Sequence, residues 1–279
     1  MPGRPRHTSL AEDGKLPDDE PAGHAQGGSI QALDRGLALL SIVAQSEGLS
    51  LTGIAQRAGI APSTAHRILA TLKAAGFVMC DARGNHLIGV KAFKVGTAFL
   101  RNRRIVDVGR RTLRELMRTS GETASMGIEN DGYVVFVAQV ECHRSIRAFH
   151  RPGSHGALHA SSLGKAIMST LPEKAVTEAL QRVGIERFTE RTIVDPSVLL
   201  ADLAATRKRG WAIDNEERAD GMRCVGAPVF NEHGEAVGAI SVSGPTVRIT
   251  DERLGELGPL VKRAAADLTE RFGGVRPKA

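Results

Sequence analysis

The chain has 279 residues, of which 42% are hydrophobic and 24% are charged, and its net charge is +6. This composition is typical of globular proteins and excludes a chain that is disordered throughout, while the length predicts two domains. The longest apolar stretch, residues 133–138, is far shorter than the roughly 20 residues of a membrane-spanning helix. The first residues contain no apolar secretory signal, and three cysteines are too few for a disulfide framework, so we expect a cytoplasmic protein without a membrane segment.

The positive charge is concentrated in one part of the chain. Residues 30–118 contain 14 Lys and Arg against 5 Asp and Glu, whereas residues 119–279 contain 20 against 21. A basic segment joined to a neutral one favours a first domain that binds a polyanion and a second domain that does not. Residues 1–29 contain almost no large apolar side chains, which predicts a disordered tail.

Three helices are predicted after this tail. The first covers residues 29–45, with Ser29 as its N-cap. Its apolar face is expected to consist of Leu33, Leu37, Leu40 and Ala44. Two short helices follow at residues 51–58 and 62–76, with Ser50 as an N-cap and Gly59 in the turn between them. The buried stripe of the third helix is predicted to contain Ala65, Ile68, Leu69 and Leu72.

A β-hairpin is predicted directly after the third helix. Residues 77–80 and 86–88 have the composition of short strands, and residues 81–85 between them contain the Gly and Asn typical of a tight turn. Helix, helix-turn-helix and hairpin in this order indicate a winged helix-turn-helix domain over residues 30–90.

The remaining chain is expected to form an arginine-rich linker helix over residues 91–118, a candidate dimer contact, and an α+β domain over residues 119–279. Predicted strands cover residues 123–129, 133–140, 211–214, 224–230 and 236–242. Predicted helices cover residues 161–171, 172–183, 196–209 and 250–272.

The second helix of a helix-turn-helix places its first residues near the base edges of the major groove. Arg67 can bind a phosphate or a guanine, and the hydroxyls of Ser63 and Thr64 can reach phosphates or bases, although a Ser-Thr pair at a helix start also serves as a plain cap. The candidate DNA contacts are Arg35, Thr52, Ser63, Thr64, His66, Arg67 and, at the tip of the wing, Arg83.

Several motifs in this order resemble the IclR family of bacterial transcriptional regulators. They are QALDRGLALL (31–40), LSLTGIAQRAGI (49–60), PSTAHRIL (62–69), LHASSLGKA (158–166), GWAIDNEE (210–217), GMRCVGAP (221–228) and AISVSG (239–244). The resemblance covers residues 30–272. It implies a GAF-like effector-binding domain after the winged domain, a homodimer or homotetramer, and affinity for a double-stranded DNA operator that is set by a small carboxylate metabolite.

The residues of the second domain can bind such an acid. A helix start offers unpaired N–H groups to a carboxylate, and two serines spaced two apart on a strand point to the same face. The candidate effector contacts are Ser162, Leu163, Gly164, Asp214, Met222, Cys224, Ser241 and Ser243. This set resembles the branch of the family that senses glyoxylate; pyruvate and glycolate are the alternatives.

Two other functions remain open. Cys224 and Asp214 can belong to a nucleophilic catalytic site, although no His is near Cys224 in the sequence, and the second domain can serve only for oligomerisation. No cofactor is expected. No metal is expected either, because Cys142, His143, His155 and His159 match no zinc spacing.

Overall fold

The computed structural model describes residues 30–101 and 104–277, and the side chains of residues 97–107 are excluded from the description. The predicted tail of residues 1–29, including Ser29, lies outside the described residues. The chain divides into two compact units between Val95 and Gly96, and each is described by itself.

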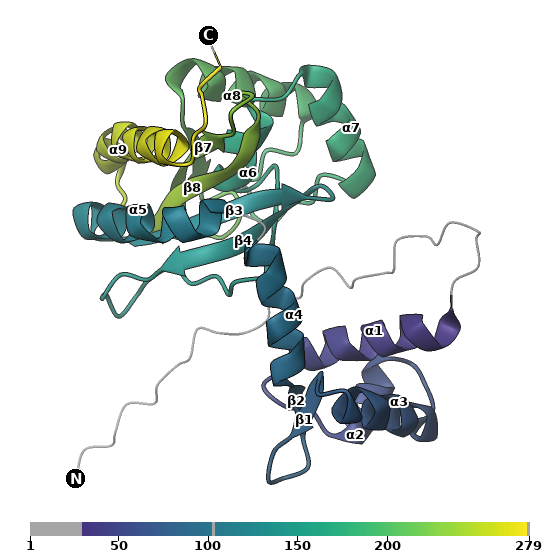
Figure 1. The fold of residues 1–279 in the computed structure, drawn as a ribbon. Coiled ribbons are helices and arrows are strands. Elements are labelled where there is room, and N and C mark those ends of the chain that lie inside the picture. Colours follow the sequence, from purple (N-terminus) through teal and green to yellow (C-terminus); the bar gives the residue numbers. More distant parts are fainter. Residues whose placement is uncertain (1–29, 102–103, 278–279) are drawn as a thin grey trace, which may run out of the picture. The chain divides into compact units, whose positions relative to one another are not determined.

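The first unit is a winged helix-turn-helix (Figure 1). Its elements are α1 (Gln31–Ala44), α2 (Leu51–Arg57), α3 (Pro62–Ala74), β1 (Val78–Cys80), β2 (His86–Ile88) and the start of α4 (Val90–Arg101). The predicted local signals are confirmed: the Ser50 hydroxyl accepts a hydrogen bond from the Gly53 N–H at 3.2 Å, and Pro62 occupies the first turn of α3. Gly59 has a φ of +62°, which allows the sharp turn between α2 and α3.

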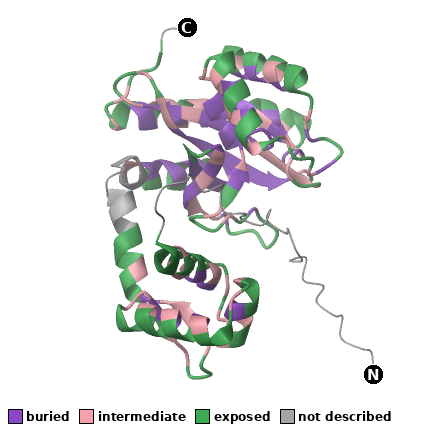
Figure 2. Ribbon diagram, turned by 90° about the vertical axis from the view of Figure 1, so that its right-hand side faces the viewer, coloured by how far each residue is buried: buried purple, intermediate pink, exposed green. Residues whose placement is uncertain are grey.

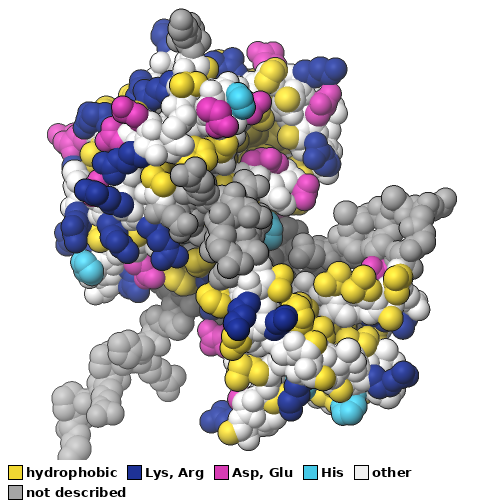
Figure 3. Space-filling view, viewed as in Figure 1, with side chains coloured by type: hydrophobic (Ala, Val, Ile, Leu, Met, Phe, Trp, Pro, Cys, Tyr) yellow, Lys and Arg dark blue, Asp and Glu magenta, His cyan; other side chains and the backbone are white. Residues whose placement is uncertain are grey.

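The predicted buried face of α1 is wrong for three of its four residues, because Leu40 packs against the small core but Leu33, Leu37 and Ala44 are exposed. Leu33 and Leu37 are each 56% exposed, whereas Leu39 and Val43 are buried against α3 and the rest of the small core. Apolar residues occupy almost every side of α1, so their spacing alone does not single out one face. Contacts with α3 decide which face of α1 is buried, and hydrophobic side chains remain on the surface along α1 (Figure 3).

The second unit is an antiparallel six-stranded sheet in the order β5-β4-β3-β8-β7-β6, with helices on both faces (Figure 1). Its strands are β3 (Thr123–Asn130), β4 (Tyr133–Val140), β5 (His155–Ala157), β6 (Ala212–Asn215), β7 (Met222–Phe230) and β8 (Ala236–Pro245). Its helices are α5 (Arg104–Ser120), α6 (Ser162–Met168), α7 (Glu173–Val183), α8 (Pro196–Arg209) and α9 (Asp251–Arg271). The sequence did not predict β5.

Alternation along the strands produces two cores, one on each face of the sheet. Figure 2 marks buried residues in the sheet and in the helices that cover it. On one face Met126, Ile240 and Val242 pack against α5 and α9. On the other face Phe136 and Ala239 pack against α6, α7 and α8. This arrangement confirms the predicted α+β class for the second domain.

The predicted linker helix has two different parts. Helix is described on both sides of residues 102–103, which lie outside the described residues. In α5, Leu113, Leu116 and Met117 are buried in the core with α9. The second half of the predicted linker is therefore part of the second unit. No helix in the described part of the chain combines the length and apolar character that crossing a membrane requires.

Candidate functional site

The predicted DNA contacts lie on the surface of the first unit. Thr64 is half-buried, and Arg35, Thr52, Ser63, His66, Arg67 and Arg83 are exposed. Ser63, Thr64, His66 and Arg67 occupy the first turns of α3, while Thr52 lies in the first turn of α2. The exposed end of α3 therefore presents cationic and hydroxyl groups without carboxylates of its own.

The wing has a rigid turn. The Asp81 carboxylate accepts hydrogen bonds from the backbone N–H groups of Arg83 and Asn85, both at 2.8 Å. These bonds, with that of Asn85 the strongest, lower the pKa of Asp81 and keep it ionised. Arg83 is thus held at the tip of an ordered hairpin, where its side chain is exposed.

In the second unit, strand register gathers the predicted effector contacts on one face of the sheet. Asp214 in β6 pairs with Cys224 in β7, and Cys224 pairs with Ser243 in β8. Directly paired residues point to the same side, and residues two apart on a strand do so as well, so Met222 and Ser241 share this side.

The register also adds residues that the sequence analysis missed. Ser243 pairs with Thr123, and Ser241 pairs with Ser125, which in turn pairs with Gln139. We call the resulting set the polar face: Thr123, Ser125, Gln139, Asp214, Cys224, Ser241 and Ser243. Polar residues at alternate positions of β3, beginning at Thr123, were the available sequence signal.

The start of α6 lies directly on this face. A Cβ atom on Gly226, which pairs with Ser241, would be 2.6 Å from the Ser162 carbonyl oxygen, so only glycine permits the contact. The Ser161 hydroxyl accepts a hydrogen bond from the Gly164 N–H at 3.1 Å and donates to the Ala157 carbonyl at 2.8 Å. This corrects one expectation: the Gly164 amide, predicted to face a carboxylate, is used by the helix cap.

The acidic groups of the polar face favour their protonated forms. Burial, assisted by the charge of Glu217, raises the pKa of Asp214 to about 7, although the Glu217 N–H donates to its carboxylate at 2.8 Å. Burial, followed by the neighbouring Asp214 charge, raises the pKa of the Cys224 thiol well above its ordinary value. The thiol is therefore protonated near neutral pH and is not a nucleophilic thiolate.

A largely buried ion cluster lies beside Asp214. Lys165 in α6 is 1% exposed, and its Nζ lies 2.6 Å from Glu217 Oε1 and 2.9 Å from Asp202 Oδ2. The second carboxylate oxygen of Glu217 is buried without a hydrogen-bond partner. Because Lys165 is shared between two carboxylates, it leaves Asp214 without a dedicated cation.

The loop between β4 and β5 closes the far side of the polar face. The Gln139 side-chain oxygen accepts hydrogen bonds from the Ser125 hydroxyl at 3.3 Å and from the His150 N–H at 2.8 Å. The His150 ring is stacked on Phe136 at a centroid distance of 4.1 Å. Burial and, to a lesser extent, the charge of Arg218 lower the pKa of His150 to about 4, so the ring is neutral.

His159, just before α6, belongs to a second stacked pair. Its Nε2 lies 2.9 Å from the Glu186 carbonyl oxygen, and its ring stacks on Phe188 at 5.8 Å. Burial lowers its pKa, so it too is neutral near pH 7. In the described part of the chain, no group of three or more His, Cys, Asp or Glu has an arrangement that could hold a metal ion.

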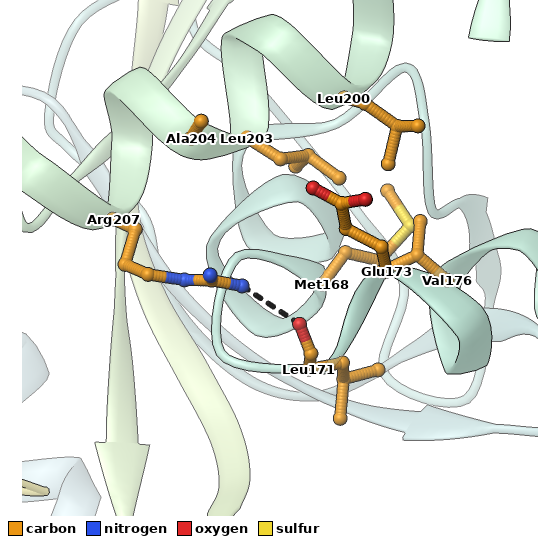
Figure 4. A pocket seen from close by; sticks show the side chains of 8 residues that line it. All are labelled: Met168, Leu171, Glu173, Val176, Leu200, Leu203, Ala204 and Arg207. Carbon is orange, nitrogen blue, oxygen red and sulfur yellow. Dashed lines mark hydrogen bonds between the residues drawn. The ribbon is translucent and has the colours of Figure 1, made fainter. Parts of the chain in front are cut away.

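A separate small pocket with room for a water-sized volume of about 20 Å³ lies between α6, α7 and α8 (Figure 4). Met168, Leu171, Val176, Leu200 and Leu203 supply its apolar walls. The Arg207 guanidinium at its edge donates to the Leu171 carbonyl at 2.7 Å. None of the predicted effector contacts lines this cavity, which belongs to the apolar packing of the three helices.

Comparisons with known proteins agree with both units. The model of the IclR helix-turn-helix domain matches residues 32–81, and the model of the bacterial transcriptional regulator IclR C-terminal domain matches residues 97–270. The chain is 46% identical over 248 residues to the HTH-type transcriptional regulator BhcR of Paracoccus denitrificans, covering 88% of this chain and 89% of BhcR.

Two further relatives extend this likeness. The transcriptional repressor IclR of Escherichia coli is 43% identical over 253 residues, covering 89% of this chain and 92% of that protein. The crystal structure of the Thermotoga maritima IclR superposes with a TM-score of 0.74 at 30% identity, covering 86% of this chain and 98% of that one. Both domains are matched in their expected order, and the chain belongs to the IclR family of bacterial transcriptional regulators.

Proposed function

We propose that this regulator binds a double-stranded DNA operator through α3 and the wing, and that glyoxylate bound at the polar face controls this binding. The observation that carries the effector assignment is the register that brings Asp214, Cys224, Ser241 and Ser243 together under the start of α6. Two hydroxyls, a thiol and a protonated carboxyl can all donate hydrogen bonds to a carboxylate and to the oxygen of an aldehyde or its hydrate.

The close contacts around the polar face favour a small acid. Gly226 and the start of α6 approach each other closely, and the β4–β5 loop covers Gln139 through His150. The single Trp of the chain, Trp211, packs against Gly258 of α9 and gives an aromatic effector no stacking partner on the polar face. Pyruvate and glycolate, which have similar size and charge, are the competing ligands.

Operator control requires more than one winged unit. A helix-turn-helix protein generally reads two half-sites as a symmetric dimer, so we propose a homodimer or homotetramer in the cytoplasm. Self-association of the first unit is supported by large apolar side chains that are exposed at the start of α1 and on α1 and α4: Ile30, Leu33, Leu37, Val90 and Phe93. The effector then acts by binding one arrangement of the oligomer more tightly than another.

Calorimetric titration of the full chain with glyoxylate, pyruvate and glycolate tests the effector assignment. We expect saturable glyoxylate binding that is lost in Asp214→Ala and Ser241→Ala and retained in Ser41→Ala, an exposed serine of the other unit. Glyoxylate should also change the affinity for genomic DNA fragments selected by the protein itself. Absence of heat with all three acids would overturn the effector assignment and leave the DNA-binding function intact.

A further inference from the structure

Arg218 differs from the other cations around the polar face. Lys165 is paired with Glu217 and Asp202, and Arg191 lies 3.5 Å from Glu216. The Arg218 guanidinium instead lies over the Phe188 ring, with its carbon 3.9 Å from the ring centroid, and it has no ion pair with any carboxylate in residues 30–101 and 104–277. Within the part of the chain that the structure describes, its guanidinium is therefore left without a direct ion-pair partner.

Three observations relate Arg218 to the edge of the polar face. It follows Glu217, whose N–H donates to the Asp214 carboxylate at 2.8 Å, and the Arg218 N–H also lowers the pKa of Asp214. Its stacking partner Phe188 also stacks on His159, close to the start of α6. Its charge also acts on His150, which covers Gln139 on the other side. Residue 218 thus lies between the acidic end of the polar face, the start of α6 and the closing loop.

The turn that carries Arg218 is held firmly. Glu216 has a φ of +63°, a left-handed conformation that is uncommon for a non-glycine residue. The hydroxyls of Thr189 and Thr192 donate to the carbonyls of Glu216 and Glu217, both at 2.7 Å. Such strain persists only where the surroundings fix it, so the turn, and with it the position of Arg218, is imposed by the segment that also supplies Phe188.

Building on the proposed function, we infer that Arg218 attracts the carboxylate effector to the polar face and balances its negative charge there. The polar face itself offers hydrogen-bond donors but no cation that is free of a carboxylate, and the neighbouring rings of His150 and His159 are neutral. An arginine over an aromatic ring keeps its N–H edge available for a carboxylate, because the stacking uses the guanidinium plane. Arg218 is therefore a binding residue for anionic ligands.

The test is titration of glyoxylate into the wild-type protein, Arg218→Gln, Arg218→Lys and the control Arg182→Gln, at 20 mM and 500 mM NaCl. Arg182 is an exposed arginine of α7, and its substitution changes the net charge equally. We expect Arg218→Gln to weaken binding about tenfold at 20 mM and less than about twofold at 500 mM, because salt screens an accessible charge. Arg218→Lys should retain most of the affinity, and Arg182→Gln should bind like the wild type.

Thermal unfolding of each variant separates folding from binding. Wild-type affinity in a folded Arg218→Gln protein would overturn the inference. An equal loss of affinity at both salt concentrations, or an equal loss in Arg218→Lys, would also overturn it, because either result would point to ring stacking and not to charge. If the wild-type protein binds none of the three acids, the proposed effector function itself fails. Glyoxylate binding without an Arg218 effect overturns only the inference.

Discussion

Asp214 in β6 lies directly opposite Cys224 in β7, and both side chains are on the sheet face that α6 covers. Two acidic groups in contact cannot both be ionised easily in a buried place, and burial raises the pKa of each. The Cys224 thiol is consequently protonated near neutral pH, and Asp214 is a protonated hydrogen-bond donor below about pH 7. A site of this kind suits an anionic ligand and weakens the folded protein when the ligand is absent.

The first prediction concerns the dependence of stability on pH. Asp214 has a pKa of about 7 in the folded protein, against 3.8 as its ordinary value. Between these values the unfolded chain has released the proton that the folded protein retains, so Asp214 contributes a fall in the free energy of unfolding as the pH rises from about 4 to about 7. His150, whose pKa is lowered to about 4, contributes a rise over part of the same range. The whole shift in the pKa of Asp214 corresponds to a free energy on the order of 4 kcal/mol. Above pH 7 the folded protein is less stable by this amount.

Asp214→Asn should remove the contribution of Asp214, so the stability of the variant relative to the wild type should increase from pH 5 to pH 8. Urea unfolding of both proteins at pH 5 and pH 8 measures the effect, and the contributions of His150 and His159 cancel in the comparison. An equal change in stability between the two pH values in the wild type and in Asp214→Asn would contradict the assignment to Asp214.

The second prediction concerns the contact between α6 and the sheet. In Gly226→Ala the new methyl group would meet the Ser162 carbonyl at 2.6 Å, so α6 must shift away from β7. We expect a loss of about 1–3 kcal/mol in stability and loss of effector binding. Gly255→Ala in the exposed part of α9, where nothing lies within 4 Å, should be neutral or stabilising by up to about 1 kcal/mol. A Gly226→Ala protein that binds the effector as the wild type does would exclude the close contact as a requirement.

The third prediction concerns the buried ion cluster. Lys165→Met leaves the buried Glu217 without its cation, whereas the partly exposed Asp202 keeps Arg209 at 3.5 Å, and the substitution should cost about 3–5 kcal/mol in urea unfolding. Lys174→Met is the control, because Lys174 is 89% exposed and its ion pair with Glu178 is long, at 3.9 Å. Its effect should stay within about 0.5 kcal/mol. Adding Glu217→Gln to Lys165→Met should recover part of the loss, and no recovery would mean that lost packing causes it.

Local signals made the order of elements predictable. Pro62 at the start of α3, the Ser50 cap and the Gly59 turn act within a few residues, and α8 begins and ends where its proline and glycine indicate. The helix-turn-helix and the alternation of strands and helices could therefore be derived from the sequence. The three-residue strand β5 carries no such signal, because its formation depends on the edge of β4.

The polar face was only half predictable. Ser241 and Ser243 show their common side by spacing, and Asp214 and Cys224 lie in recognisable motifs. Thr123 and Gln139 enter only through the register between β3, β4 and β8. The contact between Lys165 and Glu217 joins residues 52 apart, and nothing in either local sequence indicates it.

The fourth prediction tests the corrected face of α1. Leu39 is fully buried, so Leu39→Ala should cost about 2–5 kcal/mol. Leu37→Ala, two positions away but 56% exposed, should change the stability of a monomer by less than about 0.5 kcal/mol. Urea unfolding at low protein concentration compares the two, and a larger loss in Leu37→Ala would restore the face expected from spacing.

The fifth prediction concerns the DNA-binding surface. Arg67 is exposed on α3 and has no carboxylate partner among the described residues. Arg67→Ala should weaken operator binding by about 1–3 kcal/mol, or roughly 5- to 150-fold, measured by fluorescence anisotropy with a selected DNA fragment. Arg67→Lys separates two modes of contact. It should restore affinity if Arg67 binds a phosphate, and it should fail to restore the preference for the selected sequence if Arg67 reads a guanine.

Arg182→Ala, with the same change in charge in the other unit, is the control. An Arg67→Ala protein that binds the operator as tightly as this control would place the recognition surface elsewhere.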